Sequence, residues 1–357
     1  MTPARARIAD VAELAGVSPT AVSFVFSGKD AGNIAPATRQ RILDAAQTLG
    51  YRPNRVAQSL RQSRTRAIGL ITDGIASSPF AGRLVAAAGQ RLAELGHALM
   101  LYDSDFHADR EQAAAHELGA RRVDALIYAT MGLRRIAGTP TTTLPTVLAN
   151  CFQEPDVLPA AIPDEVGVGR DAARLLTGLG HRRIVMLSGP DAEDDQGWVR
   201  GNIAGPLREA GFRAGLDEAG LPDARGTIHV AGWNIDDGHA TALRCLTDGT
   251  GALRRATERA TAVFAINDRV ALGVLLAAGQ LGLSVPDDLS IVGVDDQEAL
   301  AAHLVPGLTT FRLPHAAMGE WAVETAIDLV DGTRDRAPER VLLPLELIER
   351  GTTARPR

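Results

Sequence analysis

Residues 8–18 read Ile-Ala-Asp-Val-Ala-Glu-Leu-Ala-Gly-Val-Ser, and this stretch decides how the start of the chain folds. Gly16 stands where a left-handed residue would end a first helix. Ser18 can then cap a second helix, which has Pro19 at its first position. The apolar residues of the first helix follow helical spacing, and they are Ile8, Val11, Ala12 and Ala15.

A third helix is predicted from about residue 36 to residue 49, which Gly50 ends. Two helices that cross closely need a small residue at the crossing and branched apolar residues behind it, which Ala12, Val22 and Val25 supply. This pattern predicts a helix-turn-helix, whose second helix lies in the DNA major groove. The candidate DNA contacts in this helix and its cap are Ser18, Pro19, Thr20, Ala21, Ser23 and Phe24.

Charge is distributed unevenly along the chain. Residues 1–66 carry ten basic and four acidic side chains, a net charge of +6, whereas the whole chain of 357 residues carries −6. The rest of the chain therefore carries −12. A basic segment at residues 1–66, joined to an acidic remainder, indicates that the first segment binds a polyanion and that the rest of the chain does not.

From residue 67 onward, short apolar strands alternate with amphipathic helices, which predicts parallel sheets covered by helices. About 290 residues suffice for two such subdomains, and ligands in these folds bind beyond the carboxyl ends of the strands. Strands are predicted at 67–72, 98–102, 125–129, 183–187, 226–230, 262–266 and 290–294. Helices are predicted at about 80–95, 109–119, 166–179, 206–219, 236–247 and 268–281.

Three segments together resemble the headpiece and hinge of the LacI/GalR family of bacterial transcription regulators. They are residues 8–18, Thr38-Arg39, and Leu49-Gly-Tyr-Arg-Pro-Asn-Arg-Val-Ala-Gln-Ser-Leu60. The resemblance implies a short hinge helix on operator DNA at about 53–61. It implies minor-groove or backbone contacts by Asn54, Arg55, Ala57 and Leu60, with Leu60 as an apolar wedge that bends the DNA. Packing within a helix is the alternative role for Leu60.

The body resembles the effector-binding core of the same family, for example at Leu179-Gly-His-Arg-Arg-Ile184 and Val285-Pro-Asp-Asp-Leu-Ser-Ile-Val-Gly-Val-Asp-Asp296. The fold class implied is α/β: an all-α headpiece and a periplasmic-binding-protein-like core of two doubly wound parallel-sheet subdomains. The expected domains are a headpiece at 1–62, a first subdomain at 66–163 plus about 298–331, and a second at 164–297 plus about 332–357.

Carried over by position, the family's effector contacts fall on Phe80, Arg208, Trp233, Asn267 and Asp295, with Asn150 and Asp73 as weaker candidates. A carboxylate, hydrogen-bond donors and aromatic faces are the combination that sugars need. Each residue has a structural alternative. Asp295 and Asn267 could cap helices, Arg208 could form a surface ion pair, and Trp233 and Phe80 could belong to the core.

Several positions depart from the family pattern. Phe24 stands where an arginine often reads bases, the loop from Ser27 to Asn33 is longer than the shortest versions, and Ala35 replaces a serine cap. In the core, Leu313 stands where glutamine often occurs. The segment from Ser188 to Pro206 is long and acidic.

Two other functions are compatible with parts of the sequence. Gly167-Val-Gly169-Arg-Asp-Ala172 resembles a dinucleotide fingerprint with Asp191 about twenty residues on, but the preceding residues 160–163 form a poor, proline-broken strand. A stand-alone sugar-binding receptor would need a signal peptide and would lack a basic headpiece. No catalytic or metal-binding motif occurs, and the two cysteines are 94 positions apart.

The sequence therefore predicts a cytoplasmic, homodimeric transcription regulator, and a repressor in particular. Its partners are double-stranded operator DNA and a small polar effector, a sugar or sugar derivative, which binds between the two subdomains, or lobes, of the core. No cofactor, metal, catalytic residue or membrane span is expected.

Overall fold

The computed structural model describes residues 6–27, 30, 33–51, 64–75, 82–139, 142–190, 201–221, 227–335 and 337–357. The chain divides into two units, Met1–Arg66 and Ala67–Arg357. The predicted hinge at about 53–61, with Asn54, Arg55, Ala57 and Leu60, lies outside the described residues, as does Phe80.

The first unit contains helices α1 (Ile8–Ala15), α2 (Pro19–Ser27) and α3 (Pro36–Thr48). Gly16 ends α1 with φ 63°, and its N–H group donates to the carbonyl groups of Ala12 and Glu13. Across the resulting turn, the chain bends by 107° between α1 and α2. This angle lies in the range of a helix-turn-helix. The predicted motif is confirmed, and its core consists of Val11, Ala12, Ala15, Val22, Val25, Ile42, Ala45 and Ala46.

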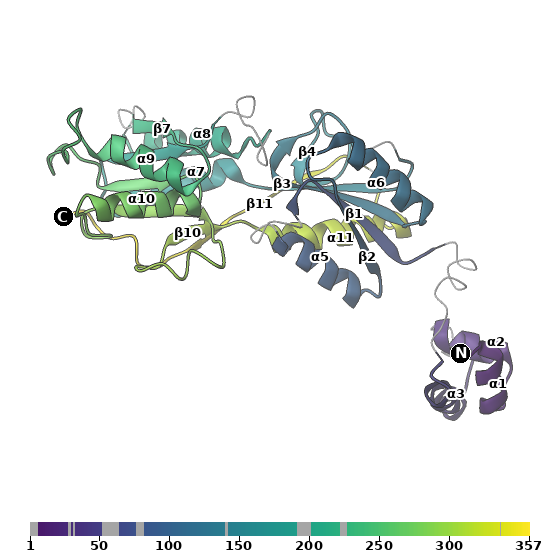
Figure 1. Cartoon of the computed structure of the whole chain (residues 1–357). Helices are drawn as coiled ribbons and strands as arrows, with labels where there is room; N and C mark the ends of the chain where they lie inside the picture. Colours follow the sequence, from purple (N-terminus) through teal and green to yellow (C-terminus); the bar gives the residue numbers. More distant parts are fainter. Residues whose placement is uncertain are drawn as a thin grey trace. The chain divides into compact units, whose positions relative to one another are not determined.

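The second unit contains two lobes, each built on a sheet with helices on both faces (Figure 1). In the first lobe, strand order is β11-β5-β4-β3-β1-β2, and every pairing is parallel. Its elements are β1 (Ala67–Thr72), α5 (Gly82–Glu94), β2 (Ala98–Asp103), α6 (Ala108–Ala120), β3 (Ala125–Arg135), β4 (Thr146–Phe152), β5 (Ala160–Pro163), α11 (His315–Asp331) and β11 (Arg340–Leu343).

The second lobe has strand order β12-β10-β9-β8-β6-β7, with β12 antiparallel to β10 and the other pairings parallel. Its elements are α7 (Glu165–Gly178), β6 (Ile184–Ser188), α8 (Ala204–Glu218), β7 (Ile228–Val230), α9 (Ile235–Leu246), β8 (Ala262–Ala265), α10 (Asp268–Gln280), β9 (Ser290–Asp295), β10 (Thr309–Arg312) and β12 (Glu346–Ile348).

Alternate residues of each strand face opposite layers of helices, because successive side chains of a strand point to opposite faces. In β1, Ile68 and Leu70 pack with α5 and α11, whereas Ala67 and Ile71 pack with α6. Figure 1 shows α5 and α11 side by side along the first sheet. The expected doubly wound fold class is confirmed in both lobes.

Two of the expected subdomain boundaries were wrong. The chain was expected to return to the first lobe at about 298 and to leave it at about 331. However, β10 pairs with β9 and therefore belongs to the second lobe up to Arg312. Strand β11 pairs with β5, so the first lobe continues to Leu343. The three crossings thus lie after Pro163, Arg312 and Leu343.

The interpretation of residues 160–163 as a poor strand was also wrong. These residues form β5, which is fully buried and pairs with β4 and β11. Proline is tolerated at its last position, because the next N–H group, that of Asp164, makes the bond to the carbonyl of Leu343. A strand therefore does precede the Gly167-Val-Gly169 segment.

Gly169 of that segment allows close packing between α7 and α8, whereas Gly167 lies against the side chain of Asp164. A Cβ atom on Gly169 would overlap the carbonyl oxygen of Arg208, and one on Gly211 would overlap that of Val166. The Oδ1 atom of Asp164 accepts the N–H of Gly167 at 2.8 Å and so caps α7. Close helix contact at Gly169 and the cap at Gly167 thus account for a pattern that resembles a dinucleotide fingerprint.

Replacing Gly169 by alanine is therefore expected to lower the free energy of unfolding by about 1–3 kcal/mol, because the methyl group overpacks the contact between two backbones. Gly178→Ala in the same helix is the control, since a Cβ atom there meets nothing within 4 Å, and alanine should stabilise the helix by roughly 0.5–1 kcal/mol. Urea unfolding measures both changes. Equal stability of the two variants would contradict this account of the glycines.

Candidate functional site

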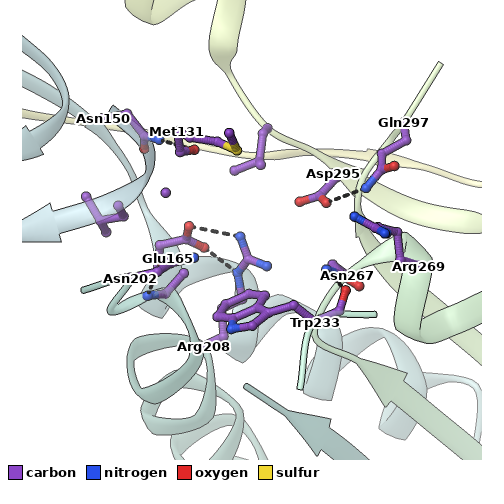
Figure 2. A pocket seen from close by; sticks show the side chains of 14 residues that line it. Met131, Asn150, Glu165, Asn202, Arg208, Trp233, Asn267, Arg269, Asp295 and Gln297 are labelled. Atoms are coloured by element: carbon purple, nitrogen blue, oxygen red, sulfur yellow. Dashed lines mark hydrogen bonds and ion pairs between the residues drawn. The ribbon is translucent and has the colours of Figure 1, made fainter. Parts of the chain in front are cut away.

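A cavity lies between the two lobes of the second unit, and side chains from both lobes line it (Figure 2). The empty space within it, including the part that is open to solvent, amounts to about 510 Å³. Four of the five predicted effector contacts line it: Arg208, Trp233, Asn267 and Asp295.

Arg208 lies on the first turns of α8 and is buried against Glu165, the first residue of α7. Its Nε and Nη2 atoms donate to the two carboxylate oxygens of Glu165 at 2.5 and 2.9 Å. Its Nη1 atom donates to the carbonyl of Ile266 at 2.5 Å. The structural alternative of a surface ion pair was thus wrong: the pair is bidentate and buried, with its geometry fixed at the cavity wall.

Asn267 connects the start of α10 to Trp233. Its Oδ1 atom accepts the N–H of Val270 at 2.8 Å, so it does cap the helix, while Nδ2 donates to the carbonyl of Trp233 at 3.1 Å. The Trp233 ring is mostly buried and packs so closely on Gly189 that a Cβ there would lie 2.8 Å from the ring. Both residues are therefore rigidly placed, and both face the cavity.

Asp295 is the last residue of β9, at the carboxyl end of the strand, and only 7% of it is exposed. Its φ of 114° is a strained conformation for a residue other than glycine, a kind of strain that clusters at functional sites. Its Oδ2 atom accepts the side-chain amide of Gln297 at 3.0 Å. Burial raises the pKa of Asp295 to about 6, and the charge of Arg208 opposes this rise.

The first lobe contributes the opposite wall through residues at the ends of β3 and β4. Asn150, in the left-handed region with φ 57°, donates from Nδ2 to the carbonyl groups of Thr130 and Met131 at 2.9 and 3.0 Å. Asp73, the other weaker candidate, lies behind this wall and does not line the cavity. Its Oδ1 atom accepts the N–H of Met131 at 2.8 Å and so holds in place the backbone of a residue that lines the cavity.

Sequence reasoning missed Glu165, Asn202, Arg269 and Gln297, which also line the cavity. Glu165 follows the capping residue Asp164, directly after β5, the strand that the sequence pattern argued against. Gln297 is two residues beyond Asp295. Leu313, noted for its departure from the family pattern, lines the cavity as an apolar group.

In the first unit, the candidate DNA contacts lie at the start and along the outer side of α2. Ser18, Pro19, Thr20 and Phe24 are exposed, whereas Ala21 and Ser23 are half-buried. The Oγ atom of Ser18 accepts the N–H of Ala21 at 3.2 Å, as expected of a cap. Ala35 makes no side-chain cap to α3, which agrees with its loss of a hydroxyl group.

Within the described parts of the chain, no single helix is long and apolar enough to cross a membrane; α1 and α2 pass such a test only as a bent pair. Among the same residues, no three His, Cys, Asp or Glu side chains are grouped as metal ligands. Both cysteines are free; Cys151 is buried and Cys245 is half-buried.

Comparison with known proteins gives the same two-part organisation. Residues 7–54 match the family described as bacterial regulatory proteins, lacI family, and residues 173–353 match the periplasmic binding protein-like domain. The regulator DegA of Bacillus subtilis (strain 168) is 33% identical over 97% of this chain and 98% of its own. The chain belongs to the LacI family.

The sucrose operon repressor of Escherichia coli is 31% identical to this LacI-family chain over 95% of it and 98% of the repressor. The crystal structure of the Lac repressor dimer bound to operator and the anti-inducer ONPF is 27% identical. It covers 98% of this chain and all of its own, with a TM-score of 0.75. This LacI-family protein is a DNA-binding transcriptional regulator, and these relatives are regulators rather than oxidoreductases or transport receptors.

Proposed function

We propose that the chain represses transcription as a homodimer and that a sugar in the cavity between the lobes controls its affinity for operator DNA. The observation that carries the proposal is the chemistry of the cavity. Two guanidinium groups, Arg208 and Arg269, are balanced by two carboxylates, Glu165 and Asp295. A balanced site of this kind suits a neutral ligand that both donates and accepts hydrogen bonds.

The other groups in the cavity fit the same ligand class. Asn150, Asn202, Asn267 and Gln297 supply amide groups that both donate and accept, as sugar hydroxyl groups require. Trp233 offers an aromatic face for the apolar side of a sugar ring. The name of the sucrose operon repressor points in the same direction for a relative of this chain. The proposed ligand contacts are Arg208, Trp233, Asn267 and Asp295, together with Phe80, which the family resemblance implies.

The DNA-binding part of the proposal rests on the helix-turn-helix and on the net charge of +6 over residues 1–66. Residues Ser18, Pro19, Thr20, Ala21, Ser23 and Phe24 contact the major groove in this proposal. Asn54, Arg55, Ala57 and Leu60 contact the minor groove or backbone, within a headpiece of residues 1–62 and a hinge at about 53–61. Two headpieces occupy two half-sites of a near-palindromic operator, consistent with the Lac repressor dimer seen on its operator.

Control by the ligand requires that it bind one arrangement of the dimer more tightly than the other, with a coupling of about 1–3 kcal/mol. The proposal assigns no catalytic step and no cofactor to the chain. Its test begins with an operator selected by the purified protein from random duplexes. Fluorescence anisotropy of that labelled operator then measures its affinity for the protein in the presence of each member of a panel of mono- and disaccharides, starting with sucrose. A panel that changes neither operator affinity nor thermal stability would refute the sugar proposal.

Binding of the full chain to a random 30-base-pair duplex is expected to weaken steeply with salt, because basic side chains release phosphate counterions. The slope of log affinity against log salt is about −0.9 for each phosphate neutralised, or roughly −5 for six contacts. Residues 67–357, which form a separate unit, should not bind the duplex. A flat salt profile, or equal binding by the truncated chain, would contradict the role of the first unit.

A further inference from the structure

Strand β3 is longer than its neighbours β1 and β4 in the first sheet. It spans eleven residues, with an irregularity in its pairing to β4 between Ala129 and Arg134. After this irregularity, Arg134 and Arg135 pair with Cys151 and Phe152 of β4. The end of β3 is therefore held by the first lobe while it reaches toward the second.

The extension of β3 pairs directly with the backbone of the second lobe. Arg134 forms an antiparallel bridge with Asn202, just before α8. The N–H group of Ile203 donates to the carbonyl of Leu133 at 2.9 Å. Because Leu133 belongs to the first lobe and Ile203 leads into α8 of the second, this backbone hydrogen bond breaks whenever the lobes separate at this point.

The side chain of Asn202 fits against a glycine of the extension. A Cβ atom on Gly132 would lie 2.8 Å from both Cγ and Nδ2 of Asn202 and 3.0 Å from its Cβ. Asn202 is buried and held in place, because its Oδ1 atom accepts the N–H of Ala204 at 3.0 Å. Gly132 does not adopt the left-handed conformation, so the close approach, and not the backbone angle, requires glycine there.

The extension is anchored in the first lobe by an ion pair. The Nη2 atom of Arg134 lies 2.6 Å from Oδ2 of Asp73, whose side chain is fully buried. The stem of Arg134 covers Gly201 of the second lobe, where a Cβ atom would lie 3.4 Å from Cδ. Arg134 thus contacts the second lobe while its charge is held by the first.

We propose that Gly132–Arg134 and Gly201–Ile203 form a latch that holds the lobes together in the absence of ligand and shapes one wall of the ligand cavity. Gly132, Leu133 and Asn202 all line that cavity. A ligand that enters or leaves by separation of the lobes must therefore break the latch. The fit of Asn202 against Gly132 sets the position of this wall and makes Asn202 a specificity-determining residue.

Hydrogen–deuterium exchange of the full chain without added small molecule tests the latch. The amide of Ile203 should exchange slowly in the unchanged chain and at least about tenfold faster in Gly132→Ala, in which the methyl group pushes the two segments apart. The matched control is Gly138→Ala in the same lobe, where a Cβ atom meets nothing within 4 Å. It should leave the Ile203 amide as slow as in the unchanged chain.

A second substitution separates loss of the latch from general damage. Asn202→Ala added to Gly132→Ala removes the two 2.8 Å approaches and should restore at least part of the slow exchange of Ile203. Amides in the middle of α7 and α10 should stay protected in every variant. The proposal fails if Ile203 exchanges at an unprotected rate in the unchanged chain, or if Gly132→Ala and Gly138→Ala give equal rates. Because no ligand is added, this outcome is independent of the proposed sugar.

Discussion

Replacing Arg208 by methionine is expected to lower the free energy of unfolding by about 3–5 kcal/mol, because Glu165 would be left as a buried charge without its partner. Both side chains are almost completely buried, and two hydrogen bonds join them. The carbonyl of Ile266 would also lose the donor at Nη1. Urea unfolding followed by circular dichroism measures the loss.

Two further variants show whether the loss comes from the unpaired charge. In the double variant Glu165→Leu with Arg208→Met, apolar side chains replace both members of the buried pair, and at least half of the lost stability should return. Arg213→Met on the same helix removes a partly exposed pair with Glu209, which should cost only about 0.3–0.5 kcal/mol. A double variant no more stable than Arg208→Met alone would contradict a dominant role for the charge of Glu165.

Helices and strands whose boundaries depend on local chemistry were predictable from the sequence. Gly16 ends α1, and the periodicity of apolar residues located α7 to within one residue of its observed bounds. These signals are local, because a cap or an apolar stripe is written in a few neighbouring residues. The helix-turn-helix and the alternation of strands and helices could therefore be predicted.

The crossings between the lobes could not be predicted in the same way. Strands β10, β11 and β12 have only three or four residues each, and the sequence pattern did not predict them. Which sheet such a strand joins depends on a partner far along the chain, as when Leu343 pairs with Pro163. Pairing of this kind is a property of the assembled fold.

The candidate site shows the same division. Arg208, Trp233, Asn267 and Asp295 were found because they match motif positions at strand and helix ends, and all four meet at one cavity. Glu165 was missed because its role depends on the contact between α7 and α8, which brings it to Arg208. Asn202 was missed because its place depends on the meeting of the two lobes at Gly132.

The proposed sugar is expected to bind with an affinity that falls as the pH drops below about 6, by up to tenfold for each pH unit. Burial raises the pKa of Asp295 to about 6. Above this value, the carboxylate is ionised and accepts hydrogen bonds from sugar hydroxyl groups; below it, binding must first remove a proton. Ligand binding thus favours the ionised form, so the affinity rises with pH and levels off above about 6.

Asp295→Asn isolates this carboxylate with little change of shape, because asparagine also tolerates positive φ. The loss of one charge-assisted hydrogen bond, about 1.5–3 kcal/mol, should lower the affinity for the sugar by roughly 10- to 150-fold at pH 8. It should also abolish the pH dependence of this affinity between pH 5 and 7. Asp171→Asn, at an exposed pair with Arg174, is the matched control and should keep the profile of the unchanged chain. Calorimetric titration with the sugar that alters operator binding measures all three proteins. If Asp295→Asn left the pH dependence intact, the titrating group would be another one, and Asp295 would lose its place as the acceptor that orients the ligand.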